Sequence, residues 1–228
     1  MGAVVLKRAG LHEKIAEVLR EQIVAGHYRS GERLNIDRLA AELGASPTPV
    51  REGLARLVAE HMVAFVANQG YRVAPPPDPA WLDDLFDVRL LLETYGVRLG
   101  AARRDPAVLR RLEDILQQME AVTRTDAESR RAFVGLDRDF HTALVASARN
   151  HVLAQQYAPL SGQLELALVR IAAFIDLAKA LQEHAAIVGA YCLGDRRAAE
   201  EALRAHLLAS EQRVGNARPL RFGVSGRG

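Results

Sequence analysis

An aspartate and three histidines in the second half of the chain have the residue types and spacing of metal ligands. Asp137 and His141 stand four residues apart in LDRDFHTAL, so on a helix their side chains lie one above the other. His184 and His206 follow in two later segments of helical pattern. If these segments pack together, three imidazoles and one carboxylate form a set that suits zinc, nickel or another borderline divalent ion.

The alternative is that these are ordinary histidines on helix surfaces or in hydrogen bonds. An Asp and a His four residues apart occur by chance, so that pair alone indicates nothing. A catalytic metal would also need a general base, and the chain has no His-Glu-x-x-His segment. The remaining histidines are interpreted as surface residues: His12, His27, His61 and His151.

The elements that would position these four groups are helices. After the first third of the chain, apolar residues recur at spacings of three and four, and strand-like alternation is rare. Breaks fall at residues that cap or turn. The pattern predicts an antiparallel bundle of about six helices, over residues 80–103, 106–122, 127–148, 150–173, 176–193 and 196–214.

A proline-rich stretch divides the chain. Four prolines fall within residues 74–79, which can neither continue a helix nor form a central strand. The closing residues are rich in Gly and Arg and poor in apolar side chains, so a flexible tail is expected there. The predicted organisation is a first domain over residues 1–75, a linker over 76–79, a helical domain over 80–215 and a tail over 216–228.

Composition restricts the class of protein. Of 228 residues, 49% are hydrophobic and 25% charged, as in soluble globular proteins. The single cysteine, Cys192, cannot form an internal disulfide, which favours a reducing compartment and hence the cytoplasm. No secretory signal is evident, nor any apolar run of the roughly 20 residues that span a bilayer. The first 75 residues carry more basic than acidic side chains, which permits nucleic-acid binding.

The first domain has the pattern of a winged helix-turn-helix. An apolar face over residues 11–23 predicts a first helix, Asn35 can cap a second helix, and Gly44 can end it. Ser46 is expected to cap a third helix through its side-chain oxygen. Pro47 suits the first helical position, where a missing N–H costs nothing. Two β-prone runs after this helix, joined by a turn over residues 67–70, predict a hairpin.

In this motif the third helix enters the major groove of DNA. Val50, Leu54 and Leu57 share its core face, which leaves Arg51 outside as a candidate for a guanine edge or a phosphate. The exposed start of the helix favours an anion. The alternative is that Arg51 only pairs with a carboxylate and that the unit is a packing module. The predicted DNA contacts from the pattern are Ser46, Thr48, Arg51, Gln69, Gly70 and Arg72.

These residues resemble a known family. The run GERL at residues 31–34, the segment TPVREGL at residues 48–54 and the hairpin glycine Gly70 resemble the DNA-binding domain of the GntR family of bacterial transcription regulators, over most of residues 11–75. The helical remainder resembles the FCD ligand-binding domain of the FadR-type branch. Members commonly have arginine where this chain has Pro47. We therefore add Arg38, at the front of the second helix, to the candidate contacts.

The resemblance implies a role for the helical domain. Metal-binding FCD domains have Asp-x-x-x-His followed by one histidine on each of the two final helices, and all four positions match here. Such pockets bind small organic acids as effectors. The resemblance implies that Arg89 grips the carboxylate of the effector, while a pair between Arg89 and Glu93 is an equal alternative. It also places Asn150 near this pocket.

The sequence therefore predicts a homodimeric regulator, not an enzyme. It would act as a repressor that binds a near-palindromic operator and releases it when a small carboxylate binds at the metal. One rival interpretation is a metal-dependent hydrolase with an appended DNA-binding module. Another is an architectural DNA-binding dimer without an effector.

Overall fold

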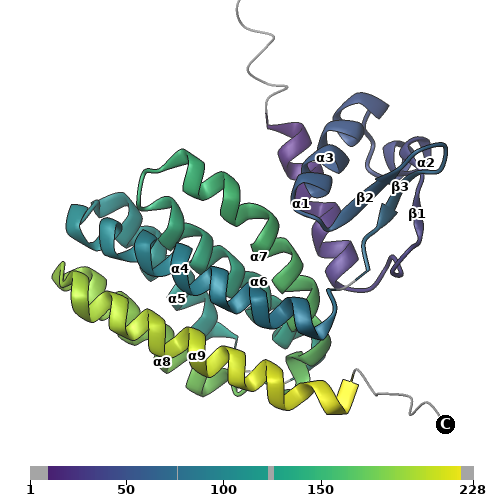
Figure 1. The fold of residues 1–228 in the computed structure, drawn as a ribbon. Helices are drawn as coiled ribbons and strands as arrows, with labels where there is room; N and C mark the ends of the chain where they lie inside the picture. Colours follow the sequence, from purple (N-terminus) through teal and green to yellow (C-terminus); the bar gives the residue numbers. More distant parts are fainter. Residues whose placement is uncertain (1–9, 76, 123–125, 222–228) are drawn as a thin grey trace, which may run out of the picture. The chain divides into compact units, whose positions relative to one another are not determined.

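The computed structural model describes residues 10–75, 77–122 and 126–221. The chain divides into two compact units, Met1–Pro76 and Pro77–Gly228. In Figure 1 the first unit contains the purple to blue elements and the second the teal to yellow ones. Helices dominate both, as predicted. None of the helices in the described ranges has an apolar stretch long enough to cross a membrane.

The N-terminal unit is a winged helix-turn-helix. Its helices are α1 (Leu11–Val24), α2 (Ile36–Glu42) and α3 (Pro47–Ala59), and its strands are β1 (Arg33–Leu34), β2 (Val63–Val66) and β3 (Gly70–Val73). The strands form one antiparallel sheet in the order β1-β3-β2. The predicted hairpin is β2 and β3. Strand β1 has only two residues, too few to show an alternating pattern in the sequence.

Close packing of α1 on α3 fixes this unit. Leu19, Leu54 and Leu57 are fully buried between the helices and the sheet. Gly53 lets the two helices approach, because a Cβ atom there would lie 3.0 Å from the Ile15 side chain and 3.2 Å from a backbone nitrogen of α1. The outward face of α3 is thereby held in place by its buried face.

The starts of α2 and α3 differ. Asn35 caps α2 as predicted, because its Oδ1 accepts a hydrogen bond from the backbone N–H of Arg38 at 3.0 Å. The prediction for Ser46 is wrong, since its side chain makes no capping bond to α3. An N-cap oxygen bonds the second or third backbone N–H of a helix; the third residue of α3 is Pro49, which has none, and Ser46 makes no bond to the N–H of the second, Thr48.

The C-terminal unit consists of helices joined by short turns. Its elements are α4 (Pro79–Arg103), α5 (Pro106–Ala121), α6 (Ala127–Ala146), α7 (His151–Ile171), the 3₁₀ helix η1 (Ala172–Phe174), α8 (Leu177–Leu193) and α9 (Arg196–Arg221). Side-chain oxygens cap α4 to α8, which is why the predicted boundaries lie close to the observed ones. The capping residues are Asp78, Asp105, Asp126, Asn150 and Asp176.

The predicted tail begins too early. Helix α9 continues to Arg221, whereas the sequence predicts an end near residue 214. Val214 is 2% exposed and belongs to the same apolar cluster as Leu82, Leu85 and Phe86 of α4, so α9 is still part of the core at residue 214. Residues 222–228 of the predicted tail lie outside the described residues.

Helix α6 lies at the centre of this unit, in contact with α4, α5 and α7. Helices α8 and α9 pack on each other and on α4 (Figure 1). An apolar cluster that includes Val97, Leu144 and Ile187 fills one part of the bundle, and a second cluster around Leu82 and Leu168 fills another. Polar side chains from α4, α6, α8 and α9 are also buried in this unit.

Candidate metal centre and nucleic-acid interface

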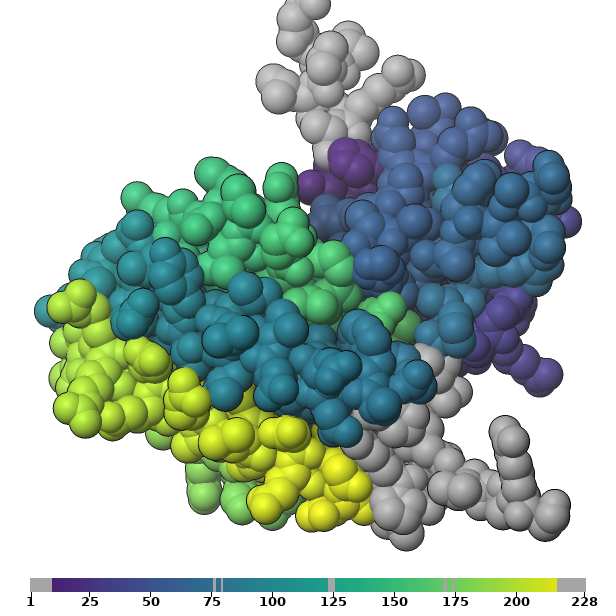
Figure 2. Space-filling model, in the orientation of Figure 1, coloured from purple at the N-terminus to yellow at the C-terminus, as the bar shows by residue number. Residues whose placement is uncertain are grey.

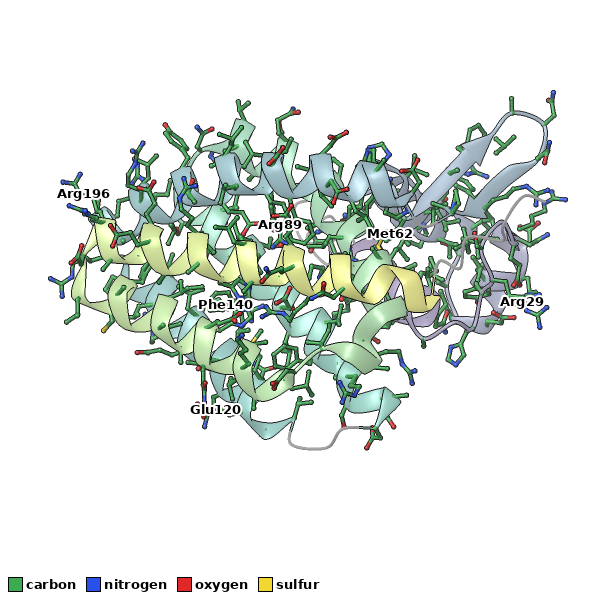
Figure 3. The ribbon with its side chains drawn as sticks, turned by 60° about the horizontal axis from the view of Figure 1, so that its bottom comes forward. Arg29, Met62, Arg89, Glu120, Phe140 and Arg196 are labelled. Atoms are coloured by element: carbon green, nitrogen blue, oxygen red, sulfur yellow. The ribbon has the colours of Figure 1, made fainter. Side chains whose placement is uncertain are left out.

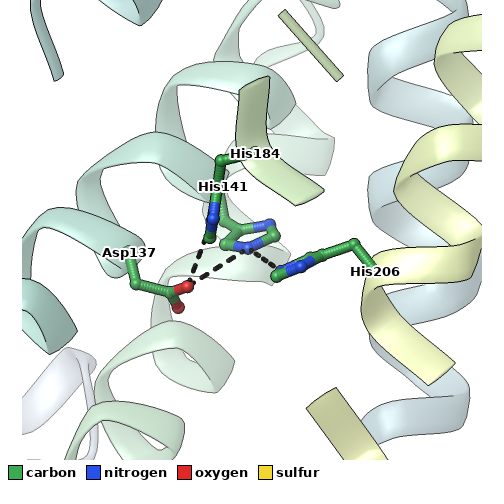
Figure 4. A group of neighbouring side chains, drawn as sticks. All are labelled: Asp137, His141, His184 and His206. Carbon is green, nitrogen blue, oxygen red and sulfur yellow. Dashed lines mark hydrogen bonds and ion pairs between the residues drawn. The ribbon is translucent and has the colours of Figure 1, made fainter. Parts of the chain in front are cut away.

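Four of these polar groups converge on one point. Asp137 and His141 come from α6, His184 from α8 and His206 from α9, and one ligand atom of each lies within 4.8 Å of the others (Figure 4). The three histidines are at most 2% exposed, and Asp137 is 15% exposed. The structure thus brings together all four predicted metal ligands.

Their separations fit a shared ion. Asp137 Oδ1 lies 3.2 Å from His184 Nε2 and 3.8 Å from His141 Nε2, and the Nε2 atoms of His141 and His206 are 3.1 Å apart. Tetrahedral ligands about 2.0–2.1 Å from zinc lie roughly 3.3 Å from one another. These three separations therefore lie within about 0.5 Å of the tetrahedral value.

The outer nitrogens of the three rings show which atoms face the centre. His141 Nδ1 lies 2.6 Å from Glu93 Oε2, and His206 Nδ1 lies 2.8 Å from a carboxylate oxygen of Glu183. His184 Nδ1 lies 2.7 Å from the carbonyl oxygen of Ala180. Ionised carboxylates and carbonyls only accept hydrogen bonds, so each Nδ1 is the protonated nitrogen. Each Nε2 then turns a free lone pair toward the other ligands.

Without a cation this arrangement is unfavourable. The lone pairs of His141 Nε2 and His206 Nε2 oppose each other at 3.1 Å, and His184 Nε2 is buried without a hydrogen-bond partner. A buried acceptor left in this way costs about 1–3 kcal/mol. A metal ion satisfies all three nitrogens and Asp137 at once, so the residues present fit a bound metal.

The protonation states also suit metal binding. Burial, together with the neighbouring His184, lowers the pKa of His206 to about 3. Burial by itself would raise the pKa of Asp137, but the three histidines outweigh it and hold that pKa below its ordinary value. Both groups are therefore in the deprotonated form that binds metal at neutral pH.

Two Arg–Glu pairs support the ligands, one of them buried and the other partly exposed. Arg89 Nε donates to Glu93 Oε1 at 2.6 Å, and the Tyr157 hydroxyl donates to the same oxygen at 3.0 Å. Arg213 donates two hydrogen bonds of 2.9 Å to Glu183. Burial would raise the pKa of both glutamates, but the partners of each lower it to about 2. Each carboxylate thus stays charged and holds its histidine in one orientation.

These supporting residues were not all visible in the sequence. The pair of Arg89 with Glu93 was one of two alternatives, and the structure contains it. Arg89 is 1% exposed and points from α4 into the bundle (Figure 3), where its Nη2 has no partner. No local signal links Glu183 or Arg213 to His206, since the contact depends on how α8 and α9 pack. Asn150 caps α7 by accepting from the N–H of Leu153 at 3.1 Å.

A small cavity adjoins two of the four groups, Asp137 and His206. Its volume is about 20 Å³, room for about one water molecule. A wider pocket of about 510 Å³ shares Phe133 and Ile175 with it. Besides Asp137 and His206, the small cavity is lined by Phe133, Val134, Leu168, Ile175, Ala180, Ser210, Arg213 and Val214.

In the N-terminal unit, the residues predicted to contact DNA lie at the start of α3 and on the hairpin. Ser46, Thr48 and Arg51 are exposed, and Arg51 forms no hydrogen bond or ion pair with the described residues. Pro47 and Pro49 have no N–H, so Thr48 offers the one free amide among the first three residues of α3. This helix start is open to a phosphate oxygen.

The other predicted contacts are already engaged within the unit. Arg38 forms a 3.0 Å ion pair with Glu42. Arg72 donates to the Gly31 carbonyl at 2.8 Å and to Gln69 at 3.1 Å. Gly70 has a φ of +81°, a left-handed conformation that glycine adopts without strain. These bonds hold the hairpin in one shape, whereas Arg51 of α3 has no such partner among the described residues.

Comparisons with known proteins find bacterial transcriptional regulators. The Nta operon transcriptional regulator of Aminobacter aminovorans is 33% identical over 144 residues, which cover 63% of this chain and 67% of that protein. The transcriptional repressor GlaR of Escherichia coli is 28% identical over 200 residues, 83% of this chain and 89% of that protein. The fold resembles E. coli McbR/YncC, with a TM-score of 0.72 at 23% identity, over 90% of this chain and 97% of that one.

Family models match both units and exclude the enzyme interpretation. Residues 11–73 match the bacterial regulatory proteins of the gntR family, and residues 84–209 match the FCD domain. These relatives are transcriptional regulators and not enzymes. Glu183 and Asp139, the carboxylates that a hydrolase could use near the metal, are paired with Arg213 and Arg138. The chain belongs to the GntR family of bacterial transcriptional regulators, in the branch with a C-terminal FCD domain.

Proposed function

We propose that this DNA-binding regulator is a homodimeric repressor that acts in the cytoplasm on a near-palindromic operator. A small organic acid that binds at a divalent metal ion, zinc or nickel, would lower the affinity of the repressor for DNA. One observation carries the proposal. Asp137 and three Nε2 atoms, each ring held with its proton on the far side, face one another beside a cavity.

The charges around this cluster favour an anionic ligand. Arg89 neutralises Glu93 and Arg213 neutralises Glu183, which leaves Asp137 as the uncompensated charge of the cluster. A bound divalent ion would give the site a net charge of +1 and would supply open coordination positions for a carboxylate oxygen. The unpartnered Nη2 of Arg89 is a second donor close to the same network.

The size of the cavity ties ligand binding to a conformational change. An acid of several atoms exceeds about 20 Å³, so its entry must displace side chains such as Phe133 and Ile175, which separate the cavity from the wider pocket. Ile175 follows η1, and Arg213 and Val214 lie on α9. Ligand binding would therefore favour a bundle with these elements shifted, which is how an effector changes a distant affinity.

The test is an operator titration. Fluorescence anisotropy of a labelled duplex from the upstream region of the gene gives the dissociation constant with metal-loaded protein, over a panel of small carboxylic acids and their uncharged amides. We expect at least one acid to weaken binding by about 10-fold or more, the lower range of allosteric coupling, and its amide to have no effect. An equal effect on metal-stripped protein would contradict the proposal.

An effector-independent, architectural DNA-binding dimer is the second candidate. The observation in its favour is the small volume of the cavity. In that case the metal would be structural, and its removal would lower the thermal stability. No acid in the panel would then change the melting temperature or the operator affinity of the loaded protein.

A further inference from the structure

The outer face of α4 is unusually apolar for an exposed helix surface. Leu91 is 71% exposed, Tyr95 41% and Val88 39%, and their spacing of three and four residues puts them on one stripe. Figure 2 shows the α4 atoms as a continuous teal band on the viewed face of this unit. Contiguous exposed apolar side chains on a soluble protein mark an interaction surface.

Charged residues flank this stripe in a fixed order. Asp84 and Asp87 precede the apolar residues, and Arg98 follows them, all exposed and on the same face. None of the three charges has an ion-pair partner among the described residues. The guanidinium of Arg98 lies over the ring of Tyr95, 5.7 Å from its centroid, which holds the arginine along the stripe.

The order is symmetric about Leu91. Asp84 stands seven residues before Leu91 and Arg98 seven after it, which is about 10.5 Å in each direction along the helix. Asp87 stands four residues before Leu91 and Tyr95 four after it. A second α4 placed antiparallel, with the two Leu91 side chains in contact, sets Asp84 opposite Arg98 twice. It also sets Asp87 opposite the hydroxyl of Tyr95 twice.

We infer that α4 pairs with α4 of a second copy of this chain, antiparallel and centred on Leu91. An isologous interface requires a surface that is complementary to itself, and this face meets the requirement in its charges as well as its apolar centre. A parallel pairing would instead set Asp84 against Asp84. The inference rests on the proposed homodimer and specifies the surface that forms it.

Charge reversal tests the pairing. Asp84→Arg and Arg98→Asp each convert two attractive contacts into two repulsive ones, so each should raise the dimer dissociation constant by about 10-fold or more. The double variant Asp84→Arg/Arg98→Asp restores opposite charges and should return to within a few-fold of the wild type. An equimolar mixture of the two single variants should form heterodimers. Sedimentation velocity of the full-length protein measures dimerisation of the two single variants, the double variant and the mixture. Circular dichroism is the control for folding.

Cross-linking tests the register. In a Cys192→Ser background, Leu91→Cys should form a covalent dimer with a short bis-maleimide, because the two residues meet at the symmetry axis. Leu193→Cys is the control, since Leu193 is 78% exposed but lies at the end of α8.

The outcomes separate the two levels of the proposal. A wild-type dimer that neither single reversal weakens, or a Leu91→Cys dimer that fails to cross-link, overturns the α4 interface and leaves the dimeric regulator standing. A double variant weaker than both single variants also overturns the antiparallel pairing. A wild type that remains monomeric at micromolar concentration overturns both the interface and the homodimer.

Discussion

The start of α3 in the N-terminal unit and the four-residue cluster in the helical unit differ in how their polar side chains are bonded. At the start of α3, Arg51 is exposed and has no hydrogen bond or ion pair with any described residue, whereas in the bundle Glu93 and Glu183 each bind an arginine and a histidine. A surface that reads DNA must exchange water for base edges and phosphates, so its groups stay free. A metal site would need ligands in fixed orientations, and the carboxylates of Glu93 and Glu183 hold two of the three histidine rings in this way.

The largest expected effect comes from removing Glu93, the buried partner of Arg89 and His141. Glu93→Ala removes the partner of Arg89, which is 1% exposed, and of His141. Removal of one member of a buried ion pair costs about 3–5 kcal/mol, so we expect a fall of that size in the free energy of unfolding by urea. The control Glu113→Ala, at an exposed site of α5, should stay within about 0.5 kcal/mol of the wild type. An equally small effect of Glu93→Ala would mean that the bonds of Glu93 to Arg89 and His141 do not stabilise the fold.

The corresponding change in the N-terminal unit should spare stability and weaken DNA binding. Arg51→Ala removes an exposed side chain without an internal partner, so its effect on unfolding should be below about 0.5 kcal/mol. Loss of a contact to a base edge costs about 1–3 kcal/mol, which is roughly 5- to 150-fold in operator affinity. Arg110→Ala removes the same charge from an exposed site of α5 and is the control. If both variants bind the operator equally well, Arg51 is not a recognition residue.

Acid should destabilise the bundle through His206. The pKa of His206 is about 3 in the folded protein and about 6.5 in an unfolded chain, so below pH 6.5 the unfolded chain takes up a proton that the folded one refuses. The contribution of neutral His206 to the free energy of unfolding is therefore complete above pH 6.5 and is lost as the pH falls toward 3. For metal-free protein we expect a loss of about 1.4 kcal/mol per pH unit.

Urea unfolding at pH 7.0 and 5.5 measures that loss. Both values lie above the range in which Glu93 and Glu183 begin to take up protons. The His206→Gln variant lacks the titrating ring, so its free energy of unfolding should depend less on pH, by about 1.4 kcal/mol per pH unit. A slope unchanged by this substitution would assign the acid sensitivity to other groups.

The smallest effect concerns the two helix starts of the N-terminal unit. Asn35→Ala removes the bond to the Arg38 N–H and should cost about 1 kcal/mol, as N-cap substitutions commonly do. Ser46→Ala removes no capping bond, so the same unfolding measurement should show almost no change. A loss of equal size at Ser46 would show that its hydroxyl does cap α3.

Features that depend on residues close together in the sequence could be predicted. Features that depend on how distant helices pack could not. The predicted helix boundaries lie close to the observed ones, because capping residues such as Asp105 and Asn150 are recognised from the few residues around them. The metal ligands were predicted from Asp137, His141 and the two later histidines through a family resemblance, and the structure brings these side chains together. The link from Glu183 to His206 depends on tertiary packing, which no local pattern contains. The predicted Ser46 cap is absent; Pro49 removes one of the two amides that an N-cap oxygen can bond, and Ser46 does not bond the other, that of Thr48.

The most direct test of the account is the metal content of the purified protein. Mass spectrometry of dialysed wild type should find about one zinc or nickel ion per chain, because four ligands with fixed orientation face one point. His184→Ala, with an unchanged helical spectrum, should retain almost none. A wild type without metal after incubation with either ion, or a His184→Ala variant that retains as much as the wild type, would contradict the metal centre on which the sensing role depends.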